Sequence, residues 1–502
     1  MKTNAVKTVC KSLLIFCVNI LLVFSVVGFV FQVLGALKGY GKVEYVIGGK
    51  GEKSRLSSIA IYKYFASKGG SWRLIFFAPE SLASNIAEDV DDAKRLLENK
   101  EMFVEKVYFN LKDVVSECSN YEVKPMQSIG EYRSSKNFVL KFDNSVDNVK
   151  GDLFLTFIDL INDEKDVKII FDVSTGLNIY VAAFLDSLRS CIVYKKLSDI
   201  LQGGKGISVE LAFSEPVMRG TNRVNVTFHE YDVKAFFELP IGKKEMSSVL
   251  DFLKVYGREK EHLVRKLVPR GSSLQMKRCL SSLRKSFNAL KYNVPLTFLY
   301  DDVLGFDENI EERVNECRSI LRKLVENIEK QKEIKLESTT GGIEIIHVKR
   351  IPINSKPLIN LFFSISLLEG IARFWKRNFQ GKDPNEGISL EDLERIFSNV
   401  YDSLHLGLNK RFLSRDLTAI RNIANGLKDE EETVLRDLKH QNEQLSKSRQ
   451  IVWGDEKRNF FAHSGLLDNY TLIKKKGGRI FLKYKLEHFR EKLKGWLKNP
   501  ED

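Results

Sequence analysis

The stretch that decides the fold is VKIIFDVSTGLN, residues 167–178, an apolar run that passes directly into small polar residues. Its Val, Ile and Phe predict a buried strand over 167–173, and a helical pattern begins near 177. Ligands of doubly wound sheets bind at the carboxyl ends of parallel strands, and helix N-termini favour phosphate. Ser174, Thr175 and the Gly176 amide are therefore candidate contacts for a phosphate-bearing ligand. A plain turn capped by Asp or Ser is the alternative.

The same strand-then-helix alternation runs through residues 21–240. Strands separated by helices of this length predict a mainly parallel sheet with both faces covered, which is a Rossmann-like α/β domain. The loop after the first strand, at 25–32, should open at the same edge as 174–178, so a phosphate-bearing ligand would bridge the two loops. The predicted strands are 21–28, 72–79, 103–109, 167–173, 207–213 and 223–229, and the predicted helices are 57–68, 82–98, 153–162 and 177–188.

After Pro240 the apolar residues recur with helical periodicity, which predicts an all-α second half. Glycine pairs at 341–342 and 477–478 each predict a hairpin within it. The sequence thus divides into an N-terminal extension (1–20), the α/β domain (21–240), a helical connecting region (241–350) and a helical domain (351–502). The predicted helices are 243–258, 274–291, 307–335, 357–378, 388–403 and 411–450.

The amino-acid composition of the chain limits the classes of function that it can have. The chain has 502 residues with 79 Lys+Arg against 66 Asp+Glu, and this charge of +13 favours an acidic partner such as nucleic acid or an anionic membrane. Its six cysteines form no Cys-x-x-Cys pair and have no His at zinc-ligand spacing, so we expect free thiols in a reducing cytosol. Two glycine-rich stretches, 47–53 and 202–208, lack the spacing of a phosphate loop, which excludes a Walker ATPase.

Residues 13–37 carry no charge and follow Lys2, Lys7 and Lys11, a pattern that also suits a signal anchor or a membrane-spanning helix. The second half of this run is rich in β-branched and aromatic residues and suits a buried parallel strand. We therefore expect a cytoplasmic protein with no membrane partner, whose first strand lies near 21–28. A membrane anchor through 13–37 stays open as the alternative.

The segment RNFFAHSGL, residues 458–466, carries the candidate chemistry. A helix beginning near Asp455 would place Asn459 and His463 on one face, and Arg458 about 140° away from His463. Two such helices meeting across a two-fold axis would gather two Arg and two His around one phosphate. RNA cleavage requires proton transfer from the 2′-hydroxyl and to the 5′-oxygen, with cationic stabilisation of the phosphorane. The alternative is that His463 caps or packs a helix and Arg458 is solvated.

Taken together, a Rossmann-like half with DVSTGLN at 172–178 and a helical half with RNFFAHSGL resemble the CRISPR-associated CARF–HEPN ribonucleases of type III systems. The segments VEY at 43–45 and SEPV at 214–217 are also similar to that family. The resemblance implies a homodimer, or a higher multiple of dimers, whose CARF domains bind a cyclic oligoadenylate, most often the tetra-adenylate. This activator would switch on metal-independent cleavage of single-stranded RNA in the paired HEPN domains, by 2′-hydroxyl attack that leaves a 2′,3′-cyclic phosphate.

The resemblance also implies roles for individual residues. Arg458 and His463 would be catalytic, and Asn459 would support the histidine; no metal or further cofactor is implied. The residues that would contact the activator are Ser25, Gly28, Ser174, Thr175, Gly176 and Asn178.

Residues 471–500 hold ten Lys and Arg against two Glu, close in sequence to His463. This basic tail would attract single-stranded RNA through its phosphates, or else it is an ordinary solvated face. Two other functions stay open for the whole chain. One is a non-catalytic nucleotide sensor or RNA-binding module, and the other is a membrane-anchored protein.

Overall fold

The computed structural model describes residues 27–35, 41–162, 164–174, 176, 178–203, 206–217, 220–242, 252–253, 267, 271–443 and 455–501. The chain divides into two compact units. Unit 1 comprises residues 1–192, 205–234 and 331–355, and unit 2 comprises residues 193–204, 235–330 and 356–502.

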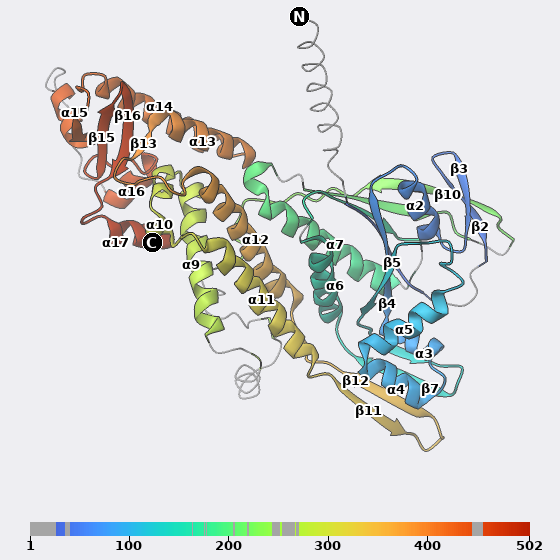
Figure 1. Ribbon diagram of the computed structural model, residues 1–502. Coiled ribbons are helices and arrows are strands. Elements are labelled where there is room, and N and C mark those ends of the chain that lie inside the picture. The colour runs from blue at the N-terminus through green and yellow to red at the C-terminus, as the bar shows by residue number, and fades with distance from the viewer. Residues whose placement is uncertain are drawn as a thin grey trace, which may run out of the picture. The chain divides into compact units, whose positions relative to one another are not determined.

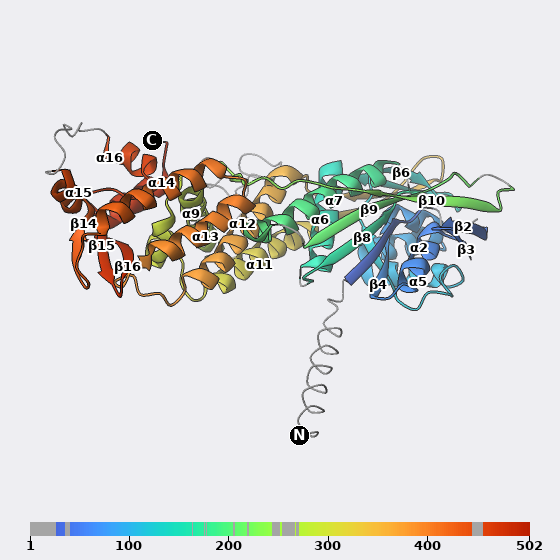
Figure 2. The same cartoon turned by 90° about the horizontal axis from the view of Figure 1, so that it is seen from above.

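Unit 1 is an α/β domain built on an eight-stranded sheet in the order β3-β2-β10-β9-β8-β1-β4-β5 (Figure 1). The five strands β9, β8, β1, β4 and β5 are parallel neighbours in this order. Figure 2 shows β9 beside β8. The elements are β1 (Val27–Val33), β2 (Val43–Ile47), β3 (Lys50–Ser54), α2 (Ser57–Ala66), β4 (Ser71–Pro79), η1 (Glu80–Leu82), α3 (Ala83–Ile86), α4 (Val90–Glu98), α5 (Lys100–Leu111), β5 (Tyr121–Met126), β6 (Gly130–Arg133), β7 (Phe138–Asp143), α6 (Val146–Ile161), β8 (Val167–Asp172), α7 (Asn178–Ser198), β9 (Ile207–Ser214), β10 (Arg223–Glu230), β11 (Glu333–Ser338) and β12 (Glu344–Lys349).

Both faces of the central parallel strands β1, β4 and β8 are buried over most of their length, as their continuous apolar composition predicts. On one face Val30 of β1 belongs to a core with residues of α2, α4 and α5. On the other face Phe31 of β1 stacks on Phe157 of α6 at 5.7 Å, and Phe171 of β8 stacks on Phe184 of α7 at 4.0 Å. Because successive side chains of a strand alternate between faces, each central strand contributes to both cores.

Two predictions for unit 1 are wrong, namely the loop at 25–32, within its described part, and the strand at 103–109. The first described strand is β1 at 27–33, so residues 27–32 are strand and not the loop expected after a strand at 21–28. Residues 103–109 lie in helix α5, because Phe103, Val107 and Leu111 recur every four residues and are its buried side chains. Asn99 begins that helix by accepting hydrogen bonds from the backbone N–H groups of Glu101 and Met102.

A second, four-stranded sheet in unit 1 has the order β11-β12-β7-β6. Its strands β11 and β12 pair antiparallel on either side of Gly341 and Gly342, as the predicted hairpin requires. Residues 333–349 were expected within the helical connecting region, but β12 pairs with β7 of the α/β unit. Long-range strand pairing therefore assigns this hairpin to unit 1.

Unit 2 is mainly helical, with a small four-stranded sheet in the order β13-β16-β15-β14. The hairpin predicted at Gly477 and Gly478 joins β15 to β16. The stretch 411–450, expected as one helix, is divided within its described part by β14, which pairs with β15. The elements are η2 (Ile200–Gln202), α9 (Ser272–Lys291), η4 (Pro295–Leu299), α10 (Asp301–Leu304), α11 (Ile310–Glu329), α12 (Ser355–Asn378), β13 (Ile388–Ser389), α13 (Leu390–Ser403), α14 (Gly407–Ala424), β14 (Glu432–Val434), α15 (Leu435–Glu443), α16 (Glu456–Ala462), β15 (Thr471–Lys476), β16 (Arg479–Tyr484) and α17 (Arg490–Lys498).

Among the described residues, one helix is long and apolar enough to cross a membrane by length and composition. This helix is α12, and 78% of its apolar window is buried within the protein. Such burial is typical of a core helix in a globular domain. Of the apolar run 13–37, residues 27–33 form strand β1, and residues 1–26 lie outside the described part of the chain.

Candidate functional site

The segment predicted to carry the chemistry begins with a short helix, α16, in unit 2. Asp455 is its N-cap, as expected, because the Asp455 carboxylate accepts hydrogen bonds from the backbone N–H of Lys457 at 2.9 Å and of Arg458 at 3.4 Å. An acidic side chain at this position also opposes the positive end of the helix dipole. The cap therefore fixes the turn on which Arg458 stands.

Phe460 anchors α16 to the rest of unit 2. Its side chain is fully buried and its ring lies 5.6 Å from Phe489 and 5.2 Å from Trp496. Burying an aromatic ring of this size contributes about 2–3 kcal/mol. Because Phe460 faces inward, the neighbouring Arg458 and Asn459 lie on the outer side of the helix, where Arg458 is exposed.

His463 is the first residue after α16 and is exposed, with a backbone φ of −113° that leaves the helix. Its backbone N–H donates to the Asn459 carbonyl at 3.1 Å. The expected bond from the Asn459 side-chain amide to the imidazole is absent from the described contacts. Within the described residues, the side chains of Arg458 and His463 make no hydrogen bond or ion pair with the protein, so both remain available to a bound molecule.

Ser464, directly after His463, ties the end of α16 to helix α14 and to the turn that follows α9. It is fully buried with a φ of 52°. Its hydroxyl donates to Asp416 of α14 at 2.7 Å and accepts from the Asn293 amide at 2.9 Å. Asp416 also accepts two hydrogen bonds from the guanidinium of Arg415, at 3.0 and 2.8 Å. A buried polar group with all its partners holds one conformation, which positions the neighbouring His463.

Gly465 completes this turn with a φ of 74°. A Cβ here would lie 2.6 Å from Val294 and 2.9 Å from the Tyr484 hydroxyl, which donates to the Gly465 carbonyl at 2.9 Å. Both the left-handed backbone and the close packing require glycine. The glycine expected to mark the end of the helix therefore lies three residues beyond Ala462, the last residue of α16.

In unit 1, the loop predicted to bind a ligand is organised by Asp172 at the end of β8. This carboxylate is fully buried, accepts a hydrogen bond from the backbone N–H of Ser174 at 3.0 Å, and accepts another from the Ser57 hydroxyl at the start of α2. Burial raises the pKa of Asp172 above its ordinary value of 3.8, while the hydrogen bonds from Ser174 and Ser57 act in the opposite direction. The carboxyl thus serves as an internal acceptor for the loop.

Ser174, Gly176 and Asn178 follow the carboxyl end of β8 in the described structure, at the edge of the sheet where the sequence predicts them. The Ser174 hydroxyl accepts a hydrogen bond from the backbone N–H of Ser214 at 2.8 Å. Gly176 has a φ of 110°, and Asn178 is exposed at the first position of α7. Two further predicted contacts, Ser25 and Thr175, lie outside the described residues.

Gly28, another predicted ligand contact, does not lie at the same edge of the sheet as Ser174, Gly176 and Asn178. It pairs with Lys168 at the amino end of β8, whereas Gln32 pairs with Asp172 at the carboxyl end. Because β1 and β8 are parallel, Gly28 lies at the opposite edge of the sheet from Ser174. A Cβ on Gly28 would lie 2.3 Å from the Trp72 indole, which gives this glycine a packing role.

The basic tail is not a free cationic surface. Most of its described cations pair with carboxylates of unit 2, as Lys474 does with Glu430 at 3.0 Å and Lys483 with Glu432 at 2.7 Å. This pairing favours the solvated-face interpretation. The paired cations are Lys474, Lys476, Arg479, Lys483, Arg490, Lys492 and Lys494.

Sequence reasoning missed the residues that hold the site from a distance. Asn293 and Asp416 meet Ser464 only through tertiary packing, and no local pattern marks them. By contrast, Arg411 and Arg415 stand one helical turn apart on α14, and this spacing of basic residues is a local signal that sequence reasoning did not use.

The α/β domain and the helical domain each match a known protein family. Residues 29–216 match the family model for the CARF domain of the CRISPR system endoribonuclease Csx1, and residues 406–487 match the model for the HEPN domain of the same enzyme. No curated protein matches the chain. Two such domains in one chain define a CRISPR-associated endoribonuclease with a nucleotide-sensing domain. The chain belongs to the CRISPR CARF–HEPN ribonucleases, which confirms the family predicted from the sequence.

Proposed function

We propose that this chain is a metal-independent endoribonuclease that cuts single-stranded RNA when a cyclic oligoadenylate, here cyclic tetra-adenylate, binds to its CARF domain in type III CRISPR defence. The observation that carries the proposal is the exposed pair Arg458 and His463, free of protein partners among the described contacts and lying within the HEPN match. We place the enzyme in the cytoplasm.

The proposed chemistry follows from the two side chains. Imidazole gains and loses protons near neutral pH, so His463 takes the proton of the 2′-hydroxyl or returns one to the leaving 5′-oxygen. The planar guanidinium of Arg458 donates to the phosphate oxygens as charge builds up on the phosphorane. The products are a 2′,3′-cyclic phosphate and a 5′-hydroxyl. Asn459 supports His463 through the backbone carbonyl that accepts its N–H.

One helix turn carries a single Arg and a single His, whereas the reaction moves two protons. We propose that a homodimer supplies the second pair, with the turns after α16 of two copies facing one RNA phosphate. In the CARF domain, Ser174, Thr175, Gly176 and Asn178 form the proposed activator contacts, and family resemblance alone adds Ser25; Gly28, at the opposite edge of the sheet, is left out.

The test is cleavage of a fluorescent single-stranded RNA by the full chain in EDTA, with and without cyclic tetra-adenylate. We expect cleavage to be stimulated by the activator, with 2′,3′-cyclic phosphate ends in the mass spectrum. His463→Ala and Arg458→Ala should each lower the rate at least 100-fold. The exposed Arg377 of α12 provides the control, because Arg377→Ala removes an arginine outside α16.

Retained cleavage in His463→Ala would remove this histidine from the mechanism. Protein that binds the activator and leaves RNA uncut under every condition would instead identify a non-catalytic nucleotide sensor. Loss of cleavage in EDTA that Mg²⁺ restores would contradict metal independence.

A further inference from the structure

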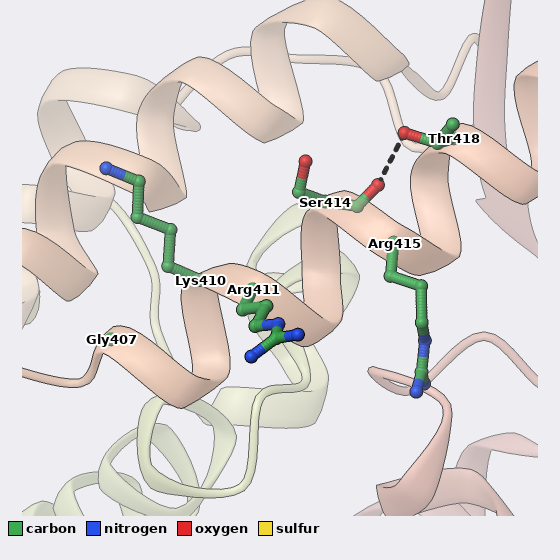
Figure 3. Close-up of a pocket in the computed structure, with 6 residues that line it drawn as sticks. All are labelled: Gly407, Lys410, Arg411, Ser414, Arg415 and Thr418. Atoms are coloured by element: carbon green, nitrogen blue, oxygen red, sulfur yellow. Dashed lines mark hydrogen bonds between the residues drawn. The ribbon is translucent and has the colours of Figure 1, made fainter.

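One face of α14 is cationic and lines an open, shallow pocket of about 490 Å³ on the surface of unit 2 (Figure 3). Lys410, Arg411 and Arg415 provide its charge. Arg411 and Arg415 are four residues apart and so share a face of α14, and Lys410 lines the same pocket beside them. No carboxylate is among the lining residues, which are Gly407, Lys410, Arg411, Ser414, Arg415 and Thr418.

The three cations differ in how far the protein neutralises them. Lys410 pairs with Asp402 at 2.6 Å, and Arg415 is held by Asp416. Arg411 is exposed and forms no ion pair with any described residue. In Figure 3 its guanidinium lies between the side chains of Lys410 and Arg415. An unpaired guanidinium beside two further cations provides a local field that attracts an anion.

An apolar surface accompanies this charge. Phe412 is 42% exposed, and the guanidinium of Arg415 lies 5.1 Å from the centre of its ring. Cations interleaved with an exposed aromatic ring are the combination that proteins use on single-stranded nucleic acid, where phosphates meet the cations and bases stack on the rings. The basic tail, whose cations are mostly paired, lacks this combination.

The same helix is joined to the candidate catalytic turn. Asp416 follows Arg415 in sequence and accepts the hydrogen bond of Ser464, the residue directly after His463. The outer face of α14, where a nucleic-acid strand would bind, is thus connected by one hydrogen-bonded network to the turn that carries the His463 imidazole.

We propose that this face of α14 is a phosphate-binding site for the RNA strand, at a nucleotide beside the one that is cut, with Arg411 making the direct contact. This proposal rests on the proposed ribonuclease function, because it names the surface that holds the substrate of that reaction. Lys410 and Arg415 provide supporting charge, and Phe412 offers a stacking surface to a base.

The test is RNA binding by the full chain carrying His463→Ala, so that the strand stays intact. Fluorescence anisotropy of a labelled single-stranded RNA is measured over a series of salt concentrations. Arg411→Gln in this background should weaken binding about tenfold, as expected for one lost charged hydrogen bond. It should also reduce the slope of log K against log salt by about 0.7, the value for one phosphate of a single strand. Arg377→Gln is the matched control and should change neither quantity.

The outcomes separate this site from the proposed function. If the wild-type chain leaves RNA uncut yet Arg411→Gln weakens binding and flattens the salt slope, the ribonuclease proposal fails and the α14 site stands. If the wild-type chain cuts RNA but Arg411→Gln changes neither affinity nor salt slope, the α14 site is overturned. That second result would also be expected if this face bound a protein partner instead.

Discussion

At the scale of single residues, the CARF loop depends on a carboxyl that no solvent reaches. Asp172 accepts hydrogen bonds from Ser57 and Ser174 while fully buried. Such a group is costly to ionise, and its hydrogen bonds offset part of that cost. The hydrogen bonds of the ligand loop therefore depend on whether the Asp172 carboxyl is protonated.

Asp172→Asn should flatten the dependence of stability on pH. Because burial raises the pKa of Asp172, the folded chain keeps this proton at pH values where the unfolded chain, with an ordinary pKa of 3.8, has lost it. The contribution is thus fully present below pH 3.8 and is lost as pH rises through the folded pKa. Asn keeps an acceptor for the Ser174 N–H and cannot ionise. The slope of the free energy of unfolding against pH should therefore change by at most about 1.4 kcal/mol per pH unit.

The measurement is chemical unfolding between pH 4 and pH 8. Asp113→Asn, at an exposed position of the same unit, is the control and should leave the profile unchanged. An unaltered profile in Asp172→Asn would mean that this carboxyl does not titrate differently in the two states.

At the scale of elements, α16 is too short to hold its own position. Seven residues form fewer than two turns, so the orientation of His463 comes from Phe460 at one point and from the contact of Ser464 with α14 at the other. Removal of that second contact should release the end of the helix without unfolding unit 2.

Ser464→Ala should lower kcat about tenfold with little change in KM, and lower the free energy of unfolding by about 1–3 kcal/mol, because Asp416 and Asn293 lose a buried partner. Ser464→Gly removes the hydroxyl without straining the backbone, since glycine adopts the φ of 52° freely. This variant therefore tests the role of the hydroxyl alone. Cleavage by Ser464→Gly at the wild-type rate would show that the hydroxyl has no positioning role. Ser403→Ala, at a half-buried site at the end of α13, is the control.

At the scale of the whole molecule, the proposed switch requires a ligand in one domain to change the chemistry of the other. Helix α7 begins at Asn178, directly after the activator loop, and its residues from Val193 onward are grouped with unit 2. A ligand shifts an equilibrium only by the difference in its affinity for two states, so binding and cleavage must be measured separately.

Cyclic tetra-adenylate should raise the unfolding temperature of His463→Ala as much as that of the wild-type chain. At 100 times its dissociation constant, a ligand that binds only the folded state stabilises it by about 2.7 kcal/mol. The measurement is thermal unfolding with and without activator, with linear tetra-adenylate as the control ligand. A shift in the wild-type chain that is lost in His463→Ala would contradict the assignment of the histidine to chemistry alone.

The sequence by itself determined the α/β and helical halves, the family, and the residues that carry the proposed chemistry. It did so because continuous apolar runs, helical periodicity and the motifs at 172–178 and 458–466 are local signals. It placed strand β8 and the glycine hairpins closely for the same reason, and it failed at 103–109, where β-forming side chains also have helical spacing.

Only the tertiary structure decided which distant residues meet. It set Gly28 at the far edge of the sheet from Ser174, paired β12 with β7, and joined Asp416 and Asn293 to the turn after His463. It also showed that the cations of the basic tail are mostly neutralised while Arg411 is not. Strand register and the partner of a charge depend on packing between segments far apart in the chain, and no local pattern records them.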